Sequence, residues 1–197
     1  MKFGCVIPAR YGSTRLPGKP LADIGGKPMI ERVYDRVSQA TKTSCTIVAT
    51  DDDRVYSAVQ QFGGTVMMTD PNHPTGTDRL AEVASHYTDL DVIINVQGDE
   101  PMIDAHLIDQ LGELFEDDAY LQMATVATPL LEDEYDDPSA VKVILNKRND
   151  AMYFSRSLIP YPRHDFVNAP LKHIGIYAYR RQFLLDYAKM KPTAAEQ

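Results

Sequence analysis

Short apolar runs alternate with segments of helical period along the first half of the chain. The first run covers 3–7, and the next segment, 29–37, repeats its apolar residues at the spacing of one helix face. The same alternation continues through the following ranges, strands first: 46–49, 65–68 and 92–96, with helices over 55–62 and 80–87. Nearly continuous apolar strands separated by helices are typical of parallel sheets covered on both faces. We therefore expect an α/β fold with a Rossmann-like, mostly parallel sheet and helices on both faces.

The order of the elements loosens after about residue 120. Four further strands are predicted, separated by polar loops: 122–128, 141–145, 151–154 and 174–179. This part is interpreted as a smaller mixed lobe or an extension of the sheet. The acidic stretch 132–137 is interpreted as a solvated surface without function, because neighbouring carboxylates on a loop are usually solvated.

Composition narrows the class of partner and the compartment. The 197 residues include 20 basic and 28 acidic side chains, so the net charge is −8, which argues against a nucleic-acid partner. Cys5 and Cys45 form neither a CxxC nor a metal-ligand spacing, which favours a reducing cytoplasm. No apolar segment approaches the length of a membrane-spanning helix. The apolar stretch at the N-terminus is too short for a signal peptide. We therefore expect a cytoplasmic protein without a membrane partner.

The loop after the first strand combines cations with glycines and prolines. Residues 8–20 hold Arg10, Arg15 and Lys19 among two glycines and three prolines. Ligands of open α/β sheets bind beyond the carboxyl ends of the strands, and glycines let backbone N–H groups approach an anion. The loop therefore predicts a phosphate-binding cradle.

Two familiar nucleotide motifs do not describe this loop. A Walker A loop is excluded because five residues separate Gly12 from Gly18, and because Pro20 follows Lys19 where a hydroxyl is needed. The G-x-G-x-x-G fingerprint of dinucleotide-binding proteins is also absent after the first strand. An oxidoreductase that uses NAD or FAD is accordingly disfavoured.

Two other loops carry polar residues whose role the spacing leaves open. The acids of 50–53 can cap the following helix, contact a ribose or hold a metal, and capping is the favoured interpretation. The segment 75–79 suits either a helix N-cap or a loop that contacts a base.

Asp99 follows the fourth strand and is the first candidate for a metal ligand. Mg²⁺ prefers a few hard oxygen ligands and keeps its remaining positions for water and phosphate. The alternative is that Asp99 and Glu100 form an acid pair at a helix N-terminus before Pro101, and Glu100 is interpreted as structural. The five histidines show no ligand spacing.

Six segments together resemble the 3-deoxy-manno-octulosonate cytidylyltransferase family, also called CMP-Kdo synthetases, over essentially the whole chain. They are 8–21, 50–52, 76–79, 95–101, the Tyr-Phe-Ser-Arg of 153–156 and the His-Ile-Gly-Ile-Tyr of 173–177. The first and fourth are shared with other sugar nucleotidyltransferases, whereas the last two together are more specific.

The resemblance implies a nucleotide-diphospho-sugar transferase-like fold and a reaction. CTP and Kdo would give CMP-Kdo and pyrophosphate with Mg²⁺, as an activation step of lipopolysaccharide synthesis. Residues 1–197 would form one nucleotidyltransferase domain, with 1–120 as the nucleotide-binding part and 121–197 as a lobe for the sugar acid and for a homodimer.

The resemblance also assigns residues. Arg10, Arg15 and Lys19 would bind the triphosphate; Arg10 and Lys19 would act in catalysis beside Asp99, the metal ligand. The residues that would flank the cytosine and the ribose are Pro8, Ala9, Gly76, Thr77 and Asp78. Those that would contact the sugar acid are Gln97, Arg156, His173 and Tyr177, with the Arg156 guanidinium suited to its carboxylate.

One departure from the family pattern affects the expected activity. The family continues beyond the position of Gln197 with a segment that supplies a second metal-binding aspartate. We therefore expect weak or no turnover, with nucleotide binding retained. The prediction of a homodimer is weakened in the same way, if that segment helps to form the interface. The alternatives are a cytidylyltransferase for a related sugar acid, such as an amino-substituted Kdo or a sialic acid, and a non-catalytic nucleotide-binding or dimerisation module.

Overall fold

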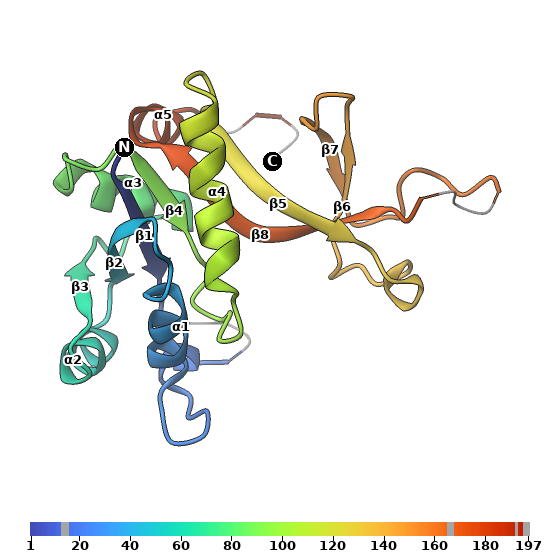
Figure 1. The fold of residues 1–197 in the computed structure, drawn as a ribbon. Helices are drawn as coiled ribbons and strands as arrows, with labels where there is room; N and C mark the ends of the chain where they lie inside the picture. Colours follow the sequence, from blue (N-terminus) through green and yellow to red (C-terminus); the bar gives the residue numbers. More distant parts are fainter. Residues whose placement is uncertain (13–15, 165–167, 192, 195–197) are drawn as a thin grey trace. The chain divides into compact units, whose positions relative to one another are not determined.

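The chain folds into two compact units. The computed structural model describes residues 1–12, 16–164, 168–191 and 193–194. The first unit comprises residues 1–124 and 177–197, and the second comprises 125–176. Two strands, β5 (Met123–Pro129) and β8 (Leu171–Arg180), begin in one unit and end in the other (Figure 1). The expected division of function, with 1–120 for the nucleotide and 121–197 for the sugar acid and the dimer, stays a prediction.

The sheet of the first unit has the strand order β3-β2-β1-β4-β8. The central strand β1 (Phe3–Pro8) runs parallel to both β2 (Thr43–Thr50) and β4 (Val92–Asn95). On the far side of β2 lies β3 (Thr65–Met68), which is also parallel. The end of β8 adds an antiparallel strand beside β4. The predicted Rossmann-like, mostly parallel sheet is confirmed for this unit.

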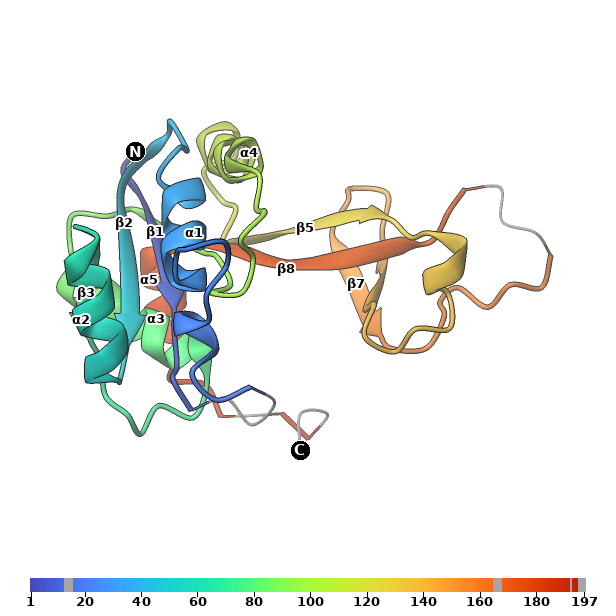
Figure 2. The ribbon, with the colours of Figure 1, turned by 90° about the horizontal axis from the view of Figure 1, so that it is seen from below.

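Helices cover both faces of this sheet, as predicted (Figures 1 and 2). One face carries α1 (Met29–Val37), α2 (Asp53–Gln61) and α4 (Ala105–Asp117), and the other carries α3 (Gly76–His86) and α5 (Arg181–Tyr187). The sequence analysis found α1, α2 and α3 but not α4 or α5. A short 3₁₀ helix, η1 (Lys19–Leu21), follows the first loop. None of the helices described is long and apolar enough to span a membrane.

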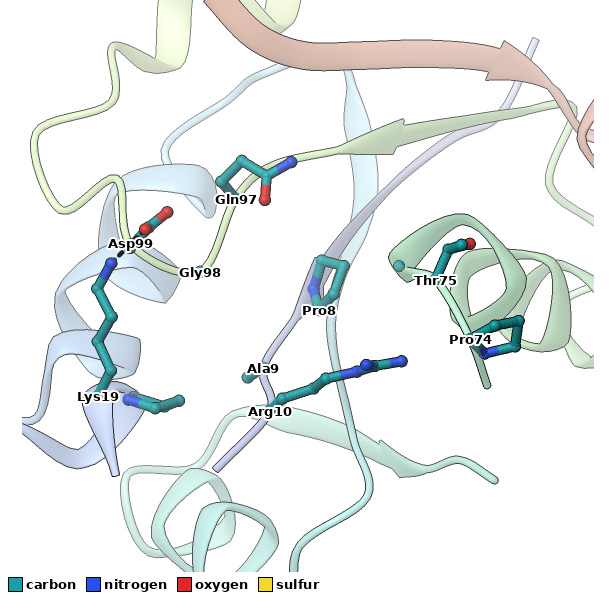
Figure 3. Close-up of a pocket in the computed structure, with 11 residues that line it drawn as sticks. Pro8, Ala9, Arg10, Lys19, Pro74, Thr75, Gln97, Gly98 and Asp99 are labelled. Atoms are coloured by element: carbon teal, nitrogen blue, oxygen red, sulfur yellow. Dashed lines mark hydrogen bonds and ion pairs between the residues drawn. The ribbon is translucent and has the colours of Figure 1, made fainter. Parts of the chain in front are cut away.

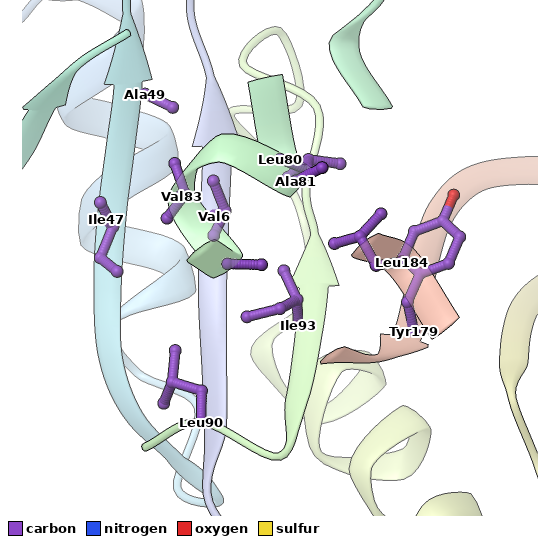
Figure 4. Close-up of a cluster of buried hydrophobic side chains, with 11 residues drawn as sticks. Val6, Ile47, Ala49, Leu80, Ala81, Val83, Leu90, Ile93, Tyr179 and Leu184 are labelled. Atoms are coloured by element: carbon purple, nitrogen blue, oxygen red, sulfur yellow. The ribbon is translucent and has the colours of Figure 1, made fainter. Parts of the chain in front are cut away.

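The core under α3 explains why these segments form these elements. Val6, Ile47 and Ile93 project from three neighbouring strands onto Leu80 and Val83 of α3 (Figure 4), and all five are fully buried. Burying one such side chain contributes roughly 1.5–3 kcal/mol. This packing fixes the strands firmly, so the loops at their carboxyl ends have a rigid base.

The second unit is built from antiparallel pairings around β6. Its strand β6 (Lys142–Leu145) pairs antiparallel with β7 (Ala151–Ser155) and with the beginning of β8, while β5 also pairs with β8. A 3₁₀ helix, η2 (Glu132–Glu134), lies in the acidic stretch. Most of that stretch is exposed, although Glu134 forms an ion pair with Lys172.

Candidate active site

A cleft opens at the carboxyl ends of β1 and β4, beside the N-terminus of α3. Its volume is about 290 Å³, and Figure 3 shows the residues that line it. The residues that line it come from three loops: Pro8, Ala9, Arg10, Lys19, Pro20, Pro74, Thr75, Gly76, Gln97, Gly98 and Asp99. Strand ends of an open α/β sheet are where ligands bind. The structure thus brings together two of the strand-end loops that the sequence analysis singled out, the loop after β1 and the loop after β4.

The first loop brings Arg10 to the cleft. The buried Ala9 continues β1 by one residue, because its N–H donates to the carbonyl of Ala49 at 2.9 Å. Arg10 is exposed, and its Nη2 donates to the backbone carbonyl of His73. A cation is therefore held at the cleft by a neutral partner. Arg15 lies outside the described residues.

The second part of this loop turns back and presents Lys19. Gly18 adopts φ = 72°, a left-handed conformation that favours glycine. Its N–H donates to the carbonyl of Tyr11 at 2.9 Å, and the ring of Tyr11 lies 3.1 Å from where a Cβ of Gly18 would be. The guanidinium of Arg54 stacks 3.3 Å from the centre of the same ring. These contacts between Tyr11 and Gly18 hold the backbone directly before η1, which begins at Lys19.

Asp99 lies opposite Lys19. Their side chains form an ion pair in which the Lys19 side chain is 32% exposed and the Asp99 side chain 42%. Gly98, just before, approaches β1 so closely that a Cβ there would lie 2.7 Å from the carbonyl oxygen of Pro8. The glycine therefore lets the two strand-end loops meet. The alternative role of Asp99 as a helix cap is wrong, because α4 begins at Ala105 and its cap is Asp104.

The chemistry of this corner fits a magnesium ion bound together with a phosphate ligand. Within the described residues, no group of three or more His, Cys, Asp or Glu side chains could hold a metal alone. Mg²⁺, however, is usually held by one or two carboxylates together with substrate phosphates and water. Asp99 is exposed at the cleft, and the cations Arg10 and Lys19 line the same cleft. One carboxylate at a phosphate cradle is the donor set that this ion accepts.

The N-terminus of α3 forms another wall of the cleft. Its geometry shows which of the two interpretations of the segment 75–79 holds. Thr75 caps the helix, and its side chain accepts from the N–H of Asp78 at 3.2 Å while the Asp78 carboxylate accepts from the N–H of Thr75 at 3.0 Å. This is a capping box, worth about 1 kcal/mol. Gly76 lines the cleft, whereas Thr77 and Asp78 are not among its lining residues. The segment 75–79 therefore is an N-cap, and its first residues still face the cleft.

The acids after β2 have structural partners. Asp52 caps α2 and forms an ion pair of 2.6 Å with Arg54, and the Arg54 guanidinium lowers the pKa of its carboxyl. Asp51 reaches Arg79 of α3, with 2.7 Å between the carboxylate and Nη2. The favoured interpretation of these acids as caps is confirmed for Asp52. Arg79 is fully buried and also contacts Thr69, so it joins α3 to the ends of β2 and β3.

The predicted sugar-acid residues fall in both units. In the first unit, Gln97 lines the cleft, whereas Tyr177 lies on β8 opposite Asn95 and is not among the lining residues. In the second unit, Arg156 donates to the carbonyl of Pro138 at 2.7 Å.

His173 of the second unit is half-buried, and burial lowers its pKa. Its Nε2 lies 2.9 Å from the hydroxyl of Thr125, and its ring meets Phe154 edge to face. A lowered pKa keeps this imidazole neutral at pH 7, so its ring suits hydrogen bonding better than charge pairing.

Four lining residues were not predicted: Pro20, Pro74, Thr75 and Gly98. Thr75 belongs to the segment 75–79, which was interpreted as an N-cap or a base-contacting loop, and a threonine three residues before an acid is a capping box. Gly98 had a local signal, since a glycine directly after a buried strand marks close backbone approach. Nothing local in the sequence indicates that Pro20 and Pro74 meet at one cleft.

Comparison with known proteins gives consistent results over the whole chain. Residues 4–197 match a family model described as cytidylyltransferase. The chain is 52% identical to the 3-deoxy-manno-octulosonate cytidylyltransferase of Escherichia coli over 192 residues, which is 98% of this chain and 78% of that protein. It is 50% identical to the protein of that name from Fusobacterium nucleatum, covering 100% of this chain and 80% of the relative.

Solved structures agree with this similarity. A structure of CMP:2-keto-3-deoxy-manno-octonic acid synthetase in complex with CTP matches with a TM-score of 0.95 and 51% identity, covering 100% of this chain and 81% of that one. A 4-diphosphocytidyl-2C-methyl-D-erythritol synthase from Anaerococcus prevotii matches with a TM-score of 0.61 at 15% identity, covering 98% of this chain and 78% of that one. The second match shows a shared fold alone.

Proposed function

Because the chain belongs to the cytidylyltransferase family, among the 3-deoxy-manno-octulosonate enzymes, we propose that it transfers CMP from CTP to Kdo. The products are CMP-Kdo and pyrophosphate, and the reaction serves lipopolysaccharide synthesis. The observation that carries this proposal is the identity of about half of all residues, over nearly the full chain, with relatives of that name. The cleft supports it, because it gathers two cations and a carboxylate at the strand ends.

The chemical obstacle in this reaction is repulsion between anions. The anomeric hydroxyl of Kdo attacks the α-phosphorus of CTP, its proton passes to water, and the bond to the leaving pyrophosphate breaks. Arg10 and Lys19 donate hydrogen bonds to the phosphate oxygens and so stabilise the charge that builds up there. Each charge-assisted hydrogen bond contributes roughly 1.5–3 kcal/mol. Arg15, outside the described residues, is proposed as a third such donor.

Asp99 is the proposed ligand of Mg²⁺. Held by Asp99, the ion would neutralise phosphate charge and would lower the pKa of the attacking hydroxyl. Asp99 has to release Lys19 for this, and the exchange is easy because a partly exposed ion pair contributes at most about 1 kcal/mol. Lys19 is then free to bind phosphate, while Pro8, Ala9 and the N-terminal residues of α3, 76–78, are proposed to flank the base and ribose.

Arg156 is proposed to bind the carboxylate of the sugar acid, and Gln97, His173 and Tyr177 keep the sugar-acid role that the family resemblance implies. The fork of N–H donors on Arg156 matches a carboxylate. Replacing Arg156 by alanine is expected to raise the KM for Kdo about tenfold or more and to leave CTP affinity unchanged in calorimetry. An equal loss for both ligands would contradict this assignment.

The second unit supports a homodimer. Its strand β7 exposes Met152, Tyr153 and Phe154, of which the first two are 66% and 65% exposed. An exposed apolar strand at the edge of a sheet can pair with a second copy of the chain. We therefore expect a dimer in sedimentation equilibrium. The free thiols of Cys5 and Cys45 and the use of CTP support a cytoplasmic location.

The proposed reaction is tested by measuring pyrophosphate release with CTP and Mg²⁺, first with Kdo and then with a sialic acid. Release with Kdo, at a rate that can be low, and not with sialic acid is expected. Release with sialic acid alone would support a related enzyme instead. Calorimetry with CTP in parallel separates a further outcome: binding of CTP without release on either acceptor would contradict catalysis and leave a nucleotide-binding module.

A further inference from the structure

The acceptor that orients Arg10 belongs to a short turn between β3 and α3. Nη2 of Arg10 donates to the backbone carbonyl of His73. In the same turn, Asn72 donates its N–H to the carboxylate of Asp70 at 2.8 Å. Proline follows His73 and restricts its backbone to an extended conformation. The direction of the carbonyl that meets Arg10 therefore depends on how this turn is held.

Glu82 on α3 holds the turn at both ends. Its Oε2 accepts the N–H of Asp70 at 2.9 Å and lies 2.5 Å from Nε2 of the His73 ring. The side chains of His73 and Glu82 are only 20% and 25% exposed. Burial alone would raise the pKa of Glu82, but the hydrogen bonds from Asp70 and His73 outweigh it and lower the pKa. The carboxylate is therefore ionised and accepts from both.

A carbonyl is a favourable partner for a cation that has to bind phosphate. A carboxylate in its place would neutralise Arg10 and would compete with the phosphates for its charge. The His73 carbonyl is neutral, so it orients the guanidinium and leaves its charge available. The imidazole of His73 meets Glu82, and His73 is not among the residues that line the cleft. His73 contacts Arg10 through its backbone carbonyl.

We propose that His73 and Glu82 are positioning residues that aim Arg10 at the phosphates of CTP. The inference rests on the proposed function, since it assumes that Arg10 binds the triphosphate. Glu82 fixes the turn, the turn fixes the His73 carbonyl, and the carbonyl fixes the guanidinium. Neither side chain contacts the nucleotide in this role.

A double-mutant cycle measured by calorimetry with CTP tests this chain of contacts. His73→Leu is expected to weaken CTP binding about tenfold, the effect of one misplaced charge-assisted hydrogen bond. In an Arg10→Ala background the same change is expected to cost less than about twofold, because the group it positions is gone. His73→Gln, whose amide can donate to Glu82, is expected to restore most of the affinity.

Controls separate this inference from the proposed function and from misfolding. His86→Leu, on α3 with Glu82, is expected to leave CTP affinity unchanged, because His86 meets the backbone carbonyl of Glu82 and not its carboxylate. The thermal unfolding midpoint shows whether each variant folds. If Arg10→Ala keeps full affinity, the proposed role of Arg10 is wrong. If Arg10→Ala loses affinity while His73→Leu does not, or if the two losses simply add, the positioning role is wrong.

Discussion

At the scale of single residues, the ion pair of Lys19 and Asp99 links the phosphate cradle to the proposed metal ligand. In the structure each side chain is the counterion of the other. CTP and Mg²⁺ would offer each of them a stronger partner. Binding of the nucleotide and of the ion is therefore expected to be coupled through this pair.

Replacing Asp99 by asparagine separates the two roles. The amide keeps the size of the side chain but loses the charge, so Mg²⁺-dependent pyrophosphate release is expected to fall about 100-fold or more. CTP affinity measured with EDTA is expected to stay the same or to rise, because Lys19 no longer has a competing carboxylate. Glu100→Gln, at the neighbouring acid, serves as the control with unchanged turnover. Near-normal pyrophosphate release by Asp99→Asn would contradict the proposal that Asp99 binds Mg²⁺.

At the scale of elements, the buried Arg79 joins α3 to the strands beneath the cleft. It is fully buried, and its partners Asp51 and Thr69 follow β2 and β3. A buried guanidinium is retained only when its partners compensate for lost hydration. This contact therefore helps to set where the N-terminus of α3, a wall of the cleft, lies against the sheet.

Replacing Arg79 by methionine is expected to lower the free energy of unfolding by about 3 kcal/mol, since Asp51 is left as a partly buried charge without its partner. Arg54→Met provides the matched control. Arg54 is also paired with an aspartate, but its side chain is 60% exposed, so a loss below about 1 kcal/mol is expected. Urea unfolding measures both, and equal losses would show that burial of Arg79 does not matter.

The elements also show how far the sequence predicts this molecule. The strands β1, β2 and β4 are continuous apolar runs, and α1 to α3 have clear helical spacing, so local pattern was sufficient for them. In α4 the buried apolar residues Ile108, Leu111 and Phe115 have that spacing too, so the sequence does contain the pattern of this helix. The short α5, by contrast, has one buried residue, so its period is too weak to find.

The candidate site divides in the same way. Arg10, Lys19 and Asp99 were predicted because each directly follows a strand, or lies in the loop after one, and strand ends share one edge. The acceptor of Arg10 could not be predicted, since His73 is 63 residues away and offers only its backbone. The partner of Asp51 is similarly distant, 28 residues along the chain. Long-range partners depend on packing, which a local pattern does not encode.

At the scale of the whole molecule, shifted pKa values on both sides of neutrality decide how stability depends on pH. Several carboxyls have pKa values below the ordinary 3.8 of Asp or 4.5 of Glu: Asp52, Asp70, Glu82, Asp89, Asp109, Glu134, Asp137 and Asp150. The folded chain therefore binds fewer protons than the unfolded chain, and this stability is present above about pH 4.5 and is lost as the pH falls.

Other groups shape the curve at higher pH. Burial lowers the pKa of His173 from its ordinary 6.5, so the stability it contributes is complete above pH 6.5 and declines below. Burial raises the pKa of Cys5 and Tyr179 above their ordinary 9.0 and 10.0. The unfolded chain releases these protons first, so their contribution is present below pH 9 and is lost above it.

The free energy of unfolding, measured with urea at steps from pH 3 to 11, is therefore expected to be highest and level between about pH 6.5 and 9. It should fall gently below this range, steeply below about pH 4.5, and again above about pH 9. Two variants test which groups cause the loss of stability on the acid and alkaline limbs of this curve. Asp109→Asn removes a carboxylate that accepts from Thr41 and Lys42 and should flatten only the acid limb, whereas Cys5→Ala should flatten only the alkaline limb. If either variant changed both limbs equally, net charge rather than these individual groups would control the pH dependence.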